Sequence, residues 1–206
     1  MTPQDSLVHS YLFLRRAIGF IGIGLPVVLV VGVLLVDHEF LDSISGYYYS
    51  PMRGVFVGAM CAVGAFLLSY RGYDRLDNLT ATAAGVAAVG VALFPTTPRG
   101  THTPAQAVVG VVHLAFASVF FLALAYFCLV LFTKSDKARP TTRKLQRNRV
   151  YVVSGWVILV CLALIVVVNL LPHTELHLAL WLESAAILAF GFAWLTKGEA
   201  ILGDLG

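Results

Sequence analysis

The chain has 206 residues, of which 59% are hydrophobic and only 12% are charged, and its formal net charge at pH 7 is +3. Soluble domains are about half apolar and about a quarter charged. The composition therefore excludes a soluble function and is typical of a polytopic membrane protein.

Six apolar runs along the chain are candidates for membrane spans, because a helix of about 20 residues crosses about 30 Å of hydrocarbon. The second and third runs are short, and the fourth is long enough to tilt. We expect an all-α bundle of six transmembrane helices that forms one membrane domain over residues 1–206. The expected spans are residues 17–36, 54–70, 79–95, 105–132, 151–171 and 175–196.

Lys and Arg are distributed unevenly over the two sides that six crossings create. Twelve of the fourteen fall on one side, seven of them within residues 133–149, whereas only Arg53 and Arg99 fall on the other. Because basic loops stay in the cytoplasm, we expect both termini to be cytoplasmic, and the short loops suit a bacterial cytoplasmic membrane. The remaining five are Arg15, Arg16, Arg71, Arg75 and Lys197.

Two of the expected spans begin with a capping residue followed by proline, at Ser50–Pro51 and Thr103–Pro104. This pattern is typical of a helix N-cap and the first helical position. Thr174 is expected to cap the sixth span in the same way. Helix starts carry free N–H groups and partial positive charge. Together with Arg53 and Arg99 they predict an anion site for a lipid phosphate on the outer side.

Three consecutive tyrosines, residues 47–49, precede the second span and predict an aromatic belt at the membrane interface. We expect Tyr49 to contact the lipid headgroup together with the two outer arginines. Within the span, Gly54, Gly58 and Ala62 form a stripe of small residues. Such a stripe indicates close helix packing or a homo-oligomer.

Ionisable residues within the apolar runs are the strongest functional signal. Glu183 lies nine residues after Thr174, about 14 Å along a helix, and an ionised acid at that depth costs on the order of 3 kcal/mol. We expect it to face the bundle and to bond His113 of the fourth span, with Asn169 as the alternative partner. The alternative for each of these polar side chains is a purely structural hydrogen bond between helices.

The last loop adds two histidines, His173 and His177, which lie four residues apart. That spacing can present two imidazoles for zinc on one helix face, although His173 can also precede the helix start. The candidate catalytic residues are His113, His177 and Glu183, in an outward-facing pocket between spans four to six and residues 37–53.

Several segments resemble the Frag/DRAM/Sfk family of membrane proteins and its bacterial relatives. They are residues 43–74, 90–95, 111–135 and 183–194. In that family a serine-containing segment and a proline precede span two, a histidine begins the apolar part of span four, and a glutamate in span six precedes a Phe-Gly-Phe run. The resemblance assigns these places to Ser43 or Ser45 with Pro51, to His113, and to Glu183 before residues 190–192. Eukaryotic members are linked to remodelling of GPI-anchor lipids and to lysosomal membranes, so the resemblance implies lipid handling.

Three functions therefore stay open. The first hypothesis is a membrane protein that handles or modifies lipid and binds the lipid headgroup. The second is a small proton-coupled transporter in which Glu183 and His113 relay protons. The third is a non-catalytic partner subunit that packs through its small-residue stripe. The sequence supplies candidate bases but no positioned nucleophile, so enzymatic activity is left open.

Overall fold

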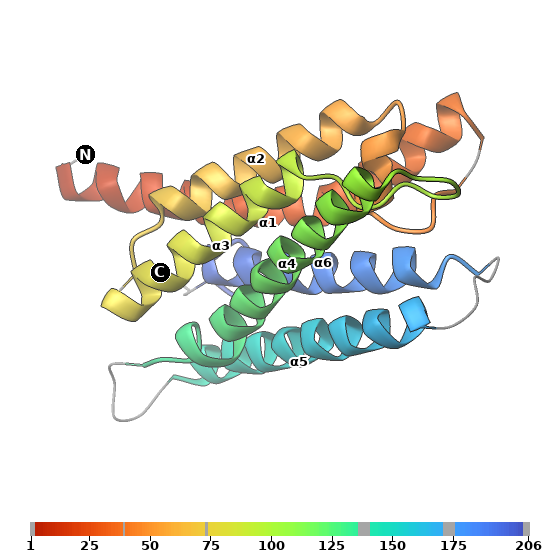
Figure 1. The fold of residues 1–206 in the computed structure, drawn as a ribbon. Helices are drawn as coiled ribbons and strands as arrows, with labels where there is room; N and C mark the ends of the chain where they lie inside the picture. The colour runs from red at the N-terminus through yellow and green to blue at the C-terminus, as the bar shows by residue number, and fades with distance from the viewer. Residues whose placement is uncertain (1–2, 39, 73, 136–140, 171–175, 204–206) are drawn as a thin grey trace.

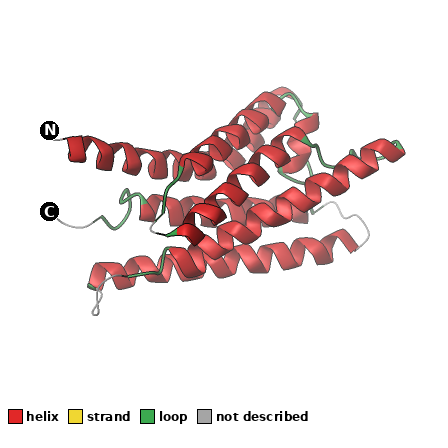
Figure 2. Ribbon diagram, turned by 60° about the vertical axis from the view of Figure 1, so that its left-hand side comes forward, coloured by secondary structure: helices red, strands yellow, loops and turns green. Residues whose placement is uncertain are grey.

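The computed structural model describes residues 3–38, 40–72, 74–135, 141–170 and 176–203. Within these residues the chain forms helices, turns and loops, and no strand (Figure 2). A 3₁₀ turn, η1, and a π-helical turn, η2, accompany six α-helices. Their bounds are α1 Pro3–Val36, η1 Ser45–Tyr49, α2 Arg53–Ser69, α3 Arg75–Leu93, α4 Pro104–Tyr126, η2 Phe127–Leu131, α5 Thr142–Leu170 and α6 Leu178–Lys197.

The helices run up and down and form a closed ring (Figure 1). Each packs against the next in chain order, and α6 returns to pack against α1. The start of α1 and the end of α6 lie at the same end of the bundle, which we call the terminal end. The opposite end, the loop end, holds η1 and residues 94–103 (Figure 1).

Five of the helices are long and apolar enough to cross a membrane: α1 from Tyr11, α3, α4 with η2, α5 and α6. Helix α2 is apolar but has only 17 residues. Large apolar side chains cover the outside of the bundle, for example Val108 on α4, which is 64% exposed. A surface of this kind needs lipid as its solvent, so the protein is a multi-pass integral membrane protein.

Four helices begin at least three residues away from the expected start of their span. Helix α1 begins at Pro3, fourteen residues early, and α3 begins at Arg75, four residues early. Helix α5 begins at Thr142, nine residues before the expected span, because its polar first turns continue the same helix. Hydropathy identifies only the part of a helix that suits hydrocarbon. Helix α6 begins at Leu178, three residues later than expected, with His177 before it in the left-handed region at φ 45°.

The predicted cap of α4 is confirmed. The Thr103 side chain accepts from Gln106 N–H at 3.2 Å, and Gln106 Oε1 accepts from Thr103 N–H at 2.8 Å, which completes a capping box with Pro104 at the start of the helix. The predicted cap at Ser50–Pro51 is wrong, since α2 begins at Arg53. Ser50 instead closes η1 by donating to Tyr47 O at 2.8 Å. The predicted cap Thr174 lies outside the described residues.

Glycines allow two pairs of helices to approach closely. Gly64 on α2 faces Gly85 on α3, where a Cβ on Gly85 would meet Gly64 O at 2.9 Å. Gly22 on α1 faces Gly191 on α6, with 3.1 Å left between a Cβ on Gly22 and Gly191 Cα. Small residues commonly mediate such packing in membranes. The predicted stripe at Gly54 and Gly58 serves neither contact, because a Cβ on either residue would meet open space.

An aromatic cluster fills the core toward the terminal end. The Trp194 ring lies 5.2 Å from Phe132, 5.4 Å from Tyr70 and 5.6 Å from Phe127, measured between ring centroids. Edge-to-face contacts at these distances stabilise aromatic cores. These side chains fill the interior of the helix bundle between the loop end and the terminal end.

Candidate functional site

Glu183, in the second turn of α6, is held by the loop end and not by another transmembrane helix. Its Oε2 accepts from Ser45 N–H at 3.2 Å and its Oε1 from Ser45 Oγ at 3.3 Å. The expected bond to His113 is therefore wrong, and Asn169 donates to Ile165 O on its own helix. Because α6 begins at Leu178, Glu183 lies only about 8 Å along the helix. That shallower depth brings it within reach of η1.

η1 reaches Glu183 because the loop that carries it folds into the bundle. Ile44 and Tyr47 flank Ser45 and are both almost fully buried. If the loop stayed in water, these apolar side chains would be exposed, which is unfavourable. Ser43 supports the turn, since its Oγ accepts from Gly46 N–H at 3.0 Å. The segment 41–49 is therefore an inserted cover over the loop end.

His113 lies buried on α4 and bonds the end of α3. Its Nδ1 is 2.7 Å from Phe94 O, so Nδ1 carries the proton and donates to that carbonyl. Phe94 follows the last residue of α3, where helix carbonyls lack partners within their own helix. His113 thus satisfies a helix C-terminus, and no described contact joins it to Glu183 or His177.

Asp42 joins two of the predicted site residues. His177 Nδ1 lies 2.5 Å from Asp42 Oδ1, and Arg99 forms an ion pair with Asp42 Oδ2. The Phe40 ring packs beside His177, with centroids 6.0 Å apart. The charge of Arg99 is therefore balanced by a carboxylate that the sequence analysis had not assigned to the site.

Arg53 and the tyrosines of η1 form the second polar group at the loop end. The Arg53 guanidinium lies 4.1 Å from the centroid of the Tyr48 ring and donates to Tyr48 Oη at 2.5 Å. Tyr49 Oη donates to Thr96 O at 2.7 Å. Burial, and then the neighbouring Tyr48, raise the pKa of Tyr49, whereas the Arg53 charge lowers it. In the part of the chain that the structure describes, no acid pairs with Arg53.

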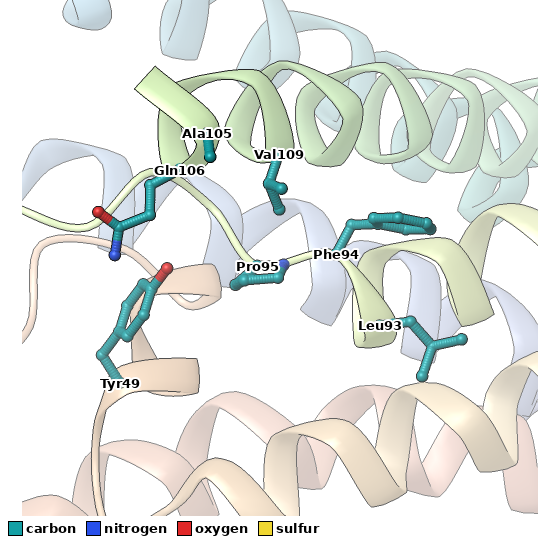
Figure 3. Close-up of a pocket in the computed structure, with 7 residues that line it drawn as sticks. All are labelled: Tyr49, Leu93, Phe94, Pro95, Ala105, Gln106 and Val109. Atoms are coloured by element: carbon teal, nitrogen blue, oxygen red, sulfur yellow. The ribbon is translucent and has the colours of Figure 1, made fainter. Parts of the chain in front are cut away.

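A pocket of about 420 Å³ lies beside these tyrosines, between the end of α3 and the start of α4 (Figure 3). Its walls are apolar except at one side, where the amide of Gln106 and the hydroxyl of Tyr49 point toward each other. Phe94, whose carbonyl bonds His113, contributes to the wall. The lining residues are Tyr49, Leu93, Phe94, Pro95, Ala105, Gln106 and Val109.

The structure describes only one of the two histidines that were predicted to bind zinc. His173 lies outside the described residues, and His177 uses Nδ1 for Asp42. Among the residues described, no group of three or more His, Cys, Asp or Glu side chains is placed to hold a metal ion.

Sequence reasoning did not include Asp42 or Gln106 among the candidate site residues, and it named Ser45 only through the family resemblance, as one of two serines. Asp42 and Ser45 belong to a loop whose neighbours Leu41, Ile44 and Tyr47 are too apolar for a solvated segment. That pattern is the available signal that the loop folds back into the bundle. Gln106 joins the pocket wall through the same side chain that caps α4 by accepting from Thr103 N–H.

The fold and this region define a class, the multi-pass α-helical membrane proteins with an inserted loop that closes one end of the bundle. No protein-family model, no characterised protein and no solved structure matches the chain. The resemblance to the Frag/DRAM/Sfk family therefore stays a prediction.

Proposed function

We propose that the protein handles lipid in a bacterial cytoplasmic membrane, where all six helices cross and both termini are cytoplasmic. The start of α1 and the end of α6, which lie at the same end of the bundle (Figure 1), and the twelve basic residues on one side support this orientation. The loop end then faces outward, at the level of the outer lipid headgroups.

The observation that carries the proposal is the pocket between α3, α4 and Tyr49. An apolar cavity with a few polar groups on one side suits an amphipathic ligand. The acyl or glycerol part of a lipid would contact Val109 and Pro95, while Gln106 and Tyr49 offer hydrogen bonds. Arg53, which acts on Tyr49 electrostatically, would attract the phosphate. Arg99 contributes less, because Asp42 already neutralises it.

Chemistry on the lipid is a separate question. Of the three candidate catalytic residues, Glu183 accepts a hydrogen bond from a hydroxyl group, Ser45 Oγ, which supports a catalytic role for this pair. His113 and His177 bond a backbone carbonyl and Asp42 instead. A transfer or hydrolysis activity would therefore use Ser45 as nucleophile and Glu183 as base, with His177 at the edge.

The proposal is tested by filling the pocket. Val109→Trp should abolish binding of a fluorescent phosphatidylglycerol to purified protein in phosphatidylcholine nanodiscs. Val108→Trp is the matched control, because the neighbouring side chain lies on the exposed face of α4. Arg53→Gln should weaken binding about tenfold, as expected for one charge-assisted contact. Unchanged binding by the Val109 variant would exclude this pocket.

A proton-coupled transporter is the second candidate, favoured by a carboxylate inside an apolar helix. The Glu183 side chain would have to exchange protons with the terminal end. The aromatic cluster of Tyr70, Phe127, Phe132 and Trp194 lies between, and Tyr70 is the one ionisable side chain among these four rings. Proton uptake by proteoliposomes that is lost in Glu183→Gln would favour this candidate over lipid handling.

A further inference from the structure

The side chain of Gln106 has a hydrogen-bonding capacity that the cap of α4 does not use. Its Oε1 accepts from Thr103 N–H at 2.8 Å and from Thr103 Oγ1 at 3.2 Å. A backbone N–H can only donate, so the amide atom that faces it is the oxygen, and the nitrogen Nε2 is the other one. In the part of the chain that the structure describes, Nε2 has no acceptor. The cap therefore leaves two N–H donors unused.

The capping box itself does not require an amide at this position. It forms with Glu as well as with Gln at the third helical residue. A Glu there would also interact favourably with the partial positive charge of the helix start. Gln106 lacks that interaction, and what it has in its place is the pair of N–H donors. The donors are thus the feature that distinguishes Gln106 from the other residue that suits this cap.

Tyr49 faces the amide but does not occupy its donors. Figure 3 shows the nitrogen of Gln106 on the side of the Tyr49 hydroxyl. The two side chains, both of which the structure describes, form no hydrogen bond with each other. Tyr49 Oη donates its one proton to Thr96 O at 2.7 Å, so toward a ligand it can only accept. Gln106 is therefore the donor on the polar side of the pocket.

The pocket lies at the level of the membrane where glycerolipids carry their ester groups. The span formed by α4 and η2 begins at Pro104 and has 28 residues, about 42 Å along a helix. This length exceeds the hydrocarbon core of about 30 Å, so the first turn of α4 lies in the interfacial layer. Gln106 is exposed there, and Leu93 in the pocket wall is 61% exposed. A lipid beside the bundle can therefore reach the amide.

We propose that the pocket recognises a glycerolipid by its acyl ester, with Gln106 Nε2 donating to the ester carbonyl. This inference rests on the proposed function, because it names the class of lipid that the same pocket binds. An amide N–H and a carbonyl oxygen form a hydrogen bond between neutral groups. An ether-linked lipid has no carbonyl at this place and would leave the donors without a partner.

The groups around the pocket follow the order of the parts of such a lipid, in which the esters lie between the phosphate and the acyl chains. The Arg53 guanidinium, the charge proposed to attract the phosphate, contacts the Tyr48 ring, which lies 5.3 Å from the Tyr49 ring between centroids. Gln106 faces Tyr49 (Figure 3), and the apolar wall of the pocket follows. The amide is thus placed between the cation and the apolar wall.

The test compares a diester lipid with its diether analogue in one sample. Purified protein is placed in nanodiscs of dialkyl-ether phosphatidylcholine, which has no ester, with equal amounts of dioleoyl phosphatidylglycerol and its dioleyl ether analogue. Native mass spectrometry measures the ratio of the two lipids that the protein retains. The wild type should retain the diester about fivefold more than the diether, as expected for one hydrogen bond between neutral groups.

Gln106→Glu is the variant that tests the donor, because it keeps the capping box and removes both N–H groups. Its ratio of diester to diether should fall to about one, since neither lipid then receives the hydrogen bond. The added negative charge repels both lipids alike, because they carry the same phosphate. Thr101→Glu is the matched control: it adds the same charge at an exposed position of the preceding loop and should keep the wild-type ratio.

The remaining outcomes separate this inference from the proposed function. Equal retention of the two lipids by the wild type, or an unchanged ratio in Gln106→Glu, would overturn the ester assignment. If Val109→Trp still lowered the retention of both lipids in that case, the lipid pocket would stand without it. A diester preference that survives Val109→Trp would overturn both proposals. Preferential retention of added oleate, whose carboxylate offers the same acceptor, would identify a fatty acid as the occupant and overturn the ester assignment.

Discussion

Glu183 on α6 receives both the backbone N–H and the hydroxyl of Ser45, a residue 138 positions earlier in the chain. This pair attaches the inserted cover, residues 41–49, to the last helix. It also explains how an apolar helix accommodates an acid. The carboxylate oxygens of Glu183 accept their hydrogen bonds at the loop end of the bundle and not at the middle of the membrane.

Two substitutions of Glu183 should separate the contribution of its charge to stability from that of its hydrogen bonds to Ser45. Glu183→Gln keeps one oxygen acceptor for Ser45 and should change the free energy of unfolding by less than about 1 kcal/mol. Glu183→Leu leaves the Ser45 N–H without a partner and should destabilise the protein by about 1–3 kcal/mol. Reversible unfolding in mixed micelles measures both. Asn169→Leu is the control, because Asn169 is exposed and bonds only its own helix. Equal stability of the Gln and Leu variants would show that the Ser45 bonds contribute little.

Acid should weaken the terminal end through Asp74. The hydrogen bond from Lys134, followed by that from Asp77 N–H, holds the pKa of the Asp74 carboxyl below its usual range, and the same pair raises the pKa of Lys134. A carboxyl whose pKa is depressed in the folded state stabilises the fold above its unfolded pKa, about 3.9. That contribution is lost as the pH falls through the folded value.

The midpoint temperature of the wild type should therefore drop more between about pH 6 and about pH 3 than that of Asp74→Asn. The exposed Asp37 supplies the matched variant: Asp37→Asn should keep the wild-type pH dependence. A thermal-shift assay in detergent measures all three proteins. Parallel curves for wild type and Asp74→Asn would contradict the assignment.

The small residues of α2 predict self-association. Gly54 and Gly58 have open space around them, and Ala62 continues the stripe. Gly58→Leu should abolish energy transfer between labelled copies in proteoliposomes while the protein stays folded, because nothing within the chain is displaced. Gly85→Leu should instead unfold the protein, since α2 lies against that position. Unchanged energy transfer in Gly58→Leu would mean that this face contacts lipid only.

The parts of the structure that follow from local sequence were predictable, and the parts that depend on one loop were not. The apolar runs and the Thr103 cap are read from neighbouring residues, and the structure reproduces them closely. The partner of Glu183 depends on where α6 begins and on the folding of residues 41–49 into the bundle. Neither has a local signal as strong as helical periodicity. The predicted bond between His113 and Glu183 failed for a similar reason, since the depth of His113 in the membrane depends on where the long α4 enters it.

The orientation of the chain underlies the proposed lipid pocket, and two exposed positions test it. In a membrane-impermeant maleimide assay on intact cells, a cysteine at Thr101 should react and a cysteine at Thr142 should react only after lysis. Both side chains are exposed, whereas Cys128 and Cys161 are buried in helices and Cys61 is partly buried on α2. The parent protein without an introduced cysteine supplies the background. Thr101 lies in the loop between α3 and α4, and Thr142 begins α5 at the other end (Figure 1).

If α2 failed to cross, the two positions would still lie on opposite sides, but Arg71 and the N-terminus would not share a side. A third cysteine at the exposed Asp37, which lies between α1 and α2, therefore distinguishes six crossings from five: it should behave like Thr101 if α2 crosses and like Thr142 if it does not. Labelling of Thr142 in intact cells would reverse the orientation and would place the pocket on the inner side of the membrane.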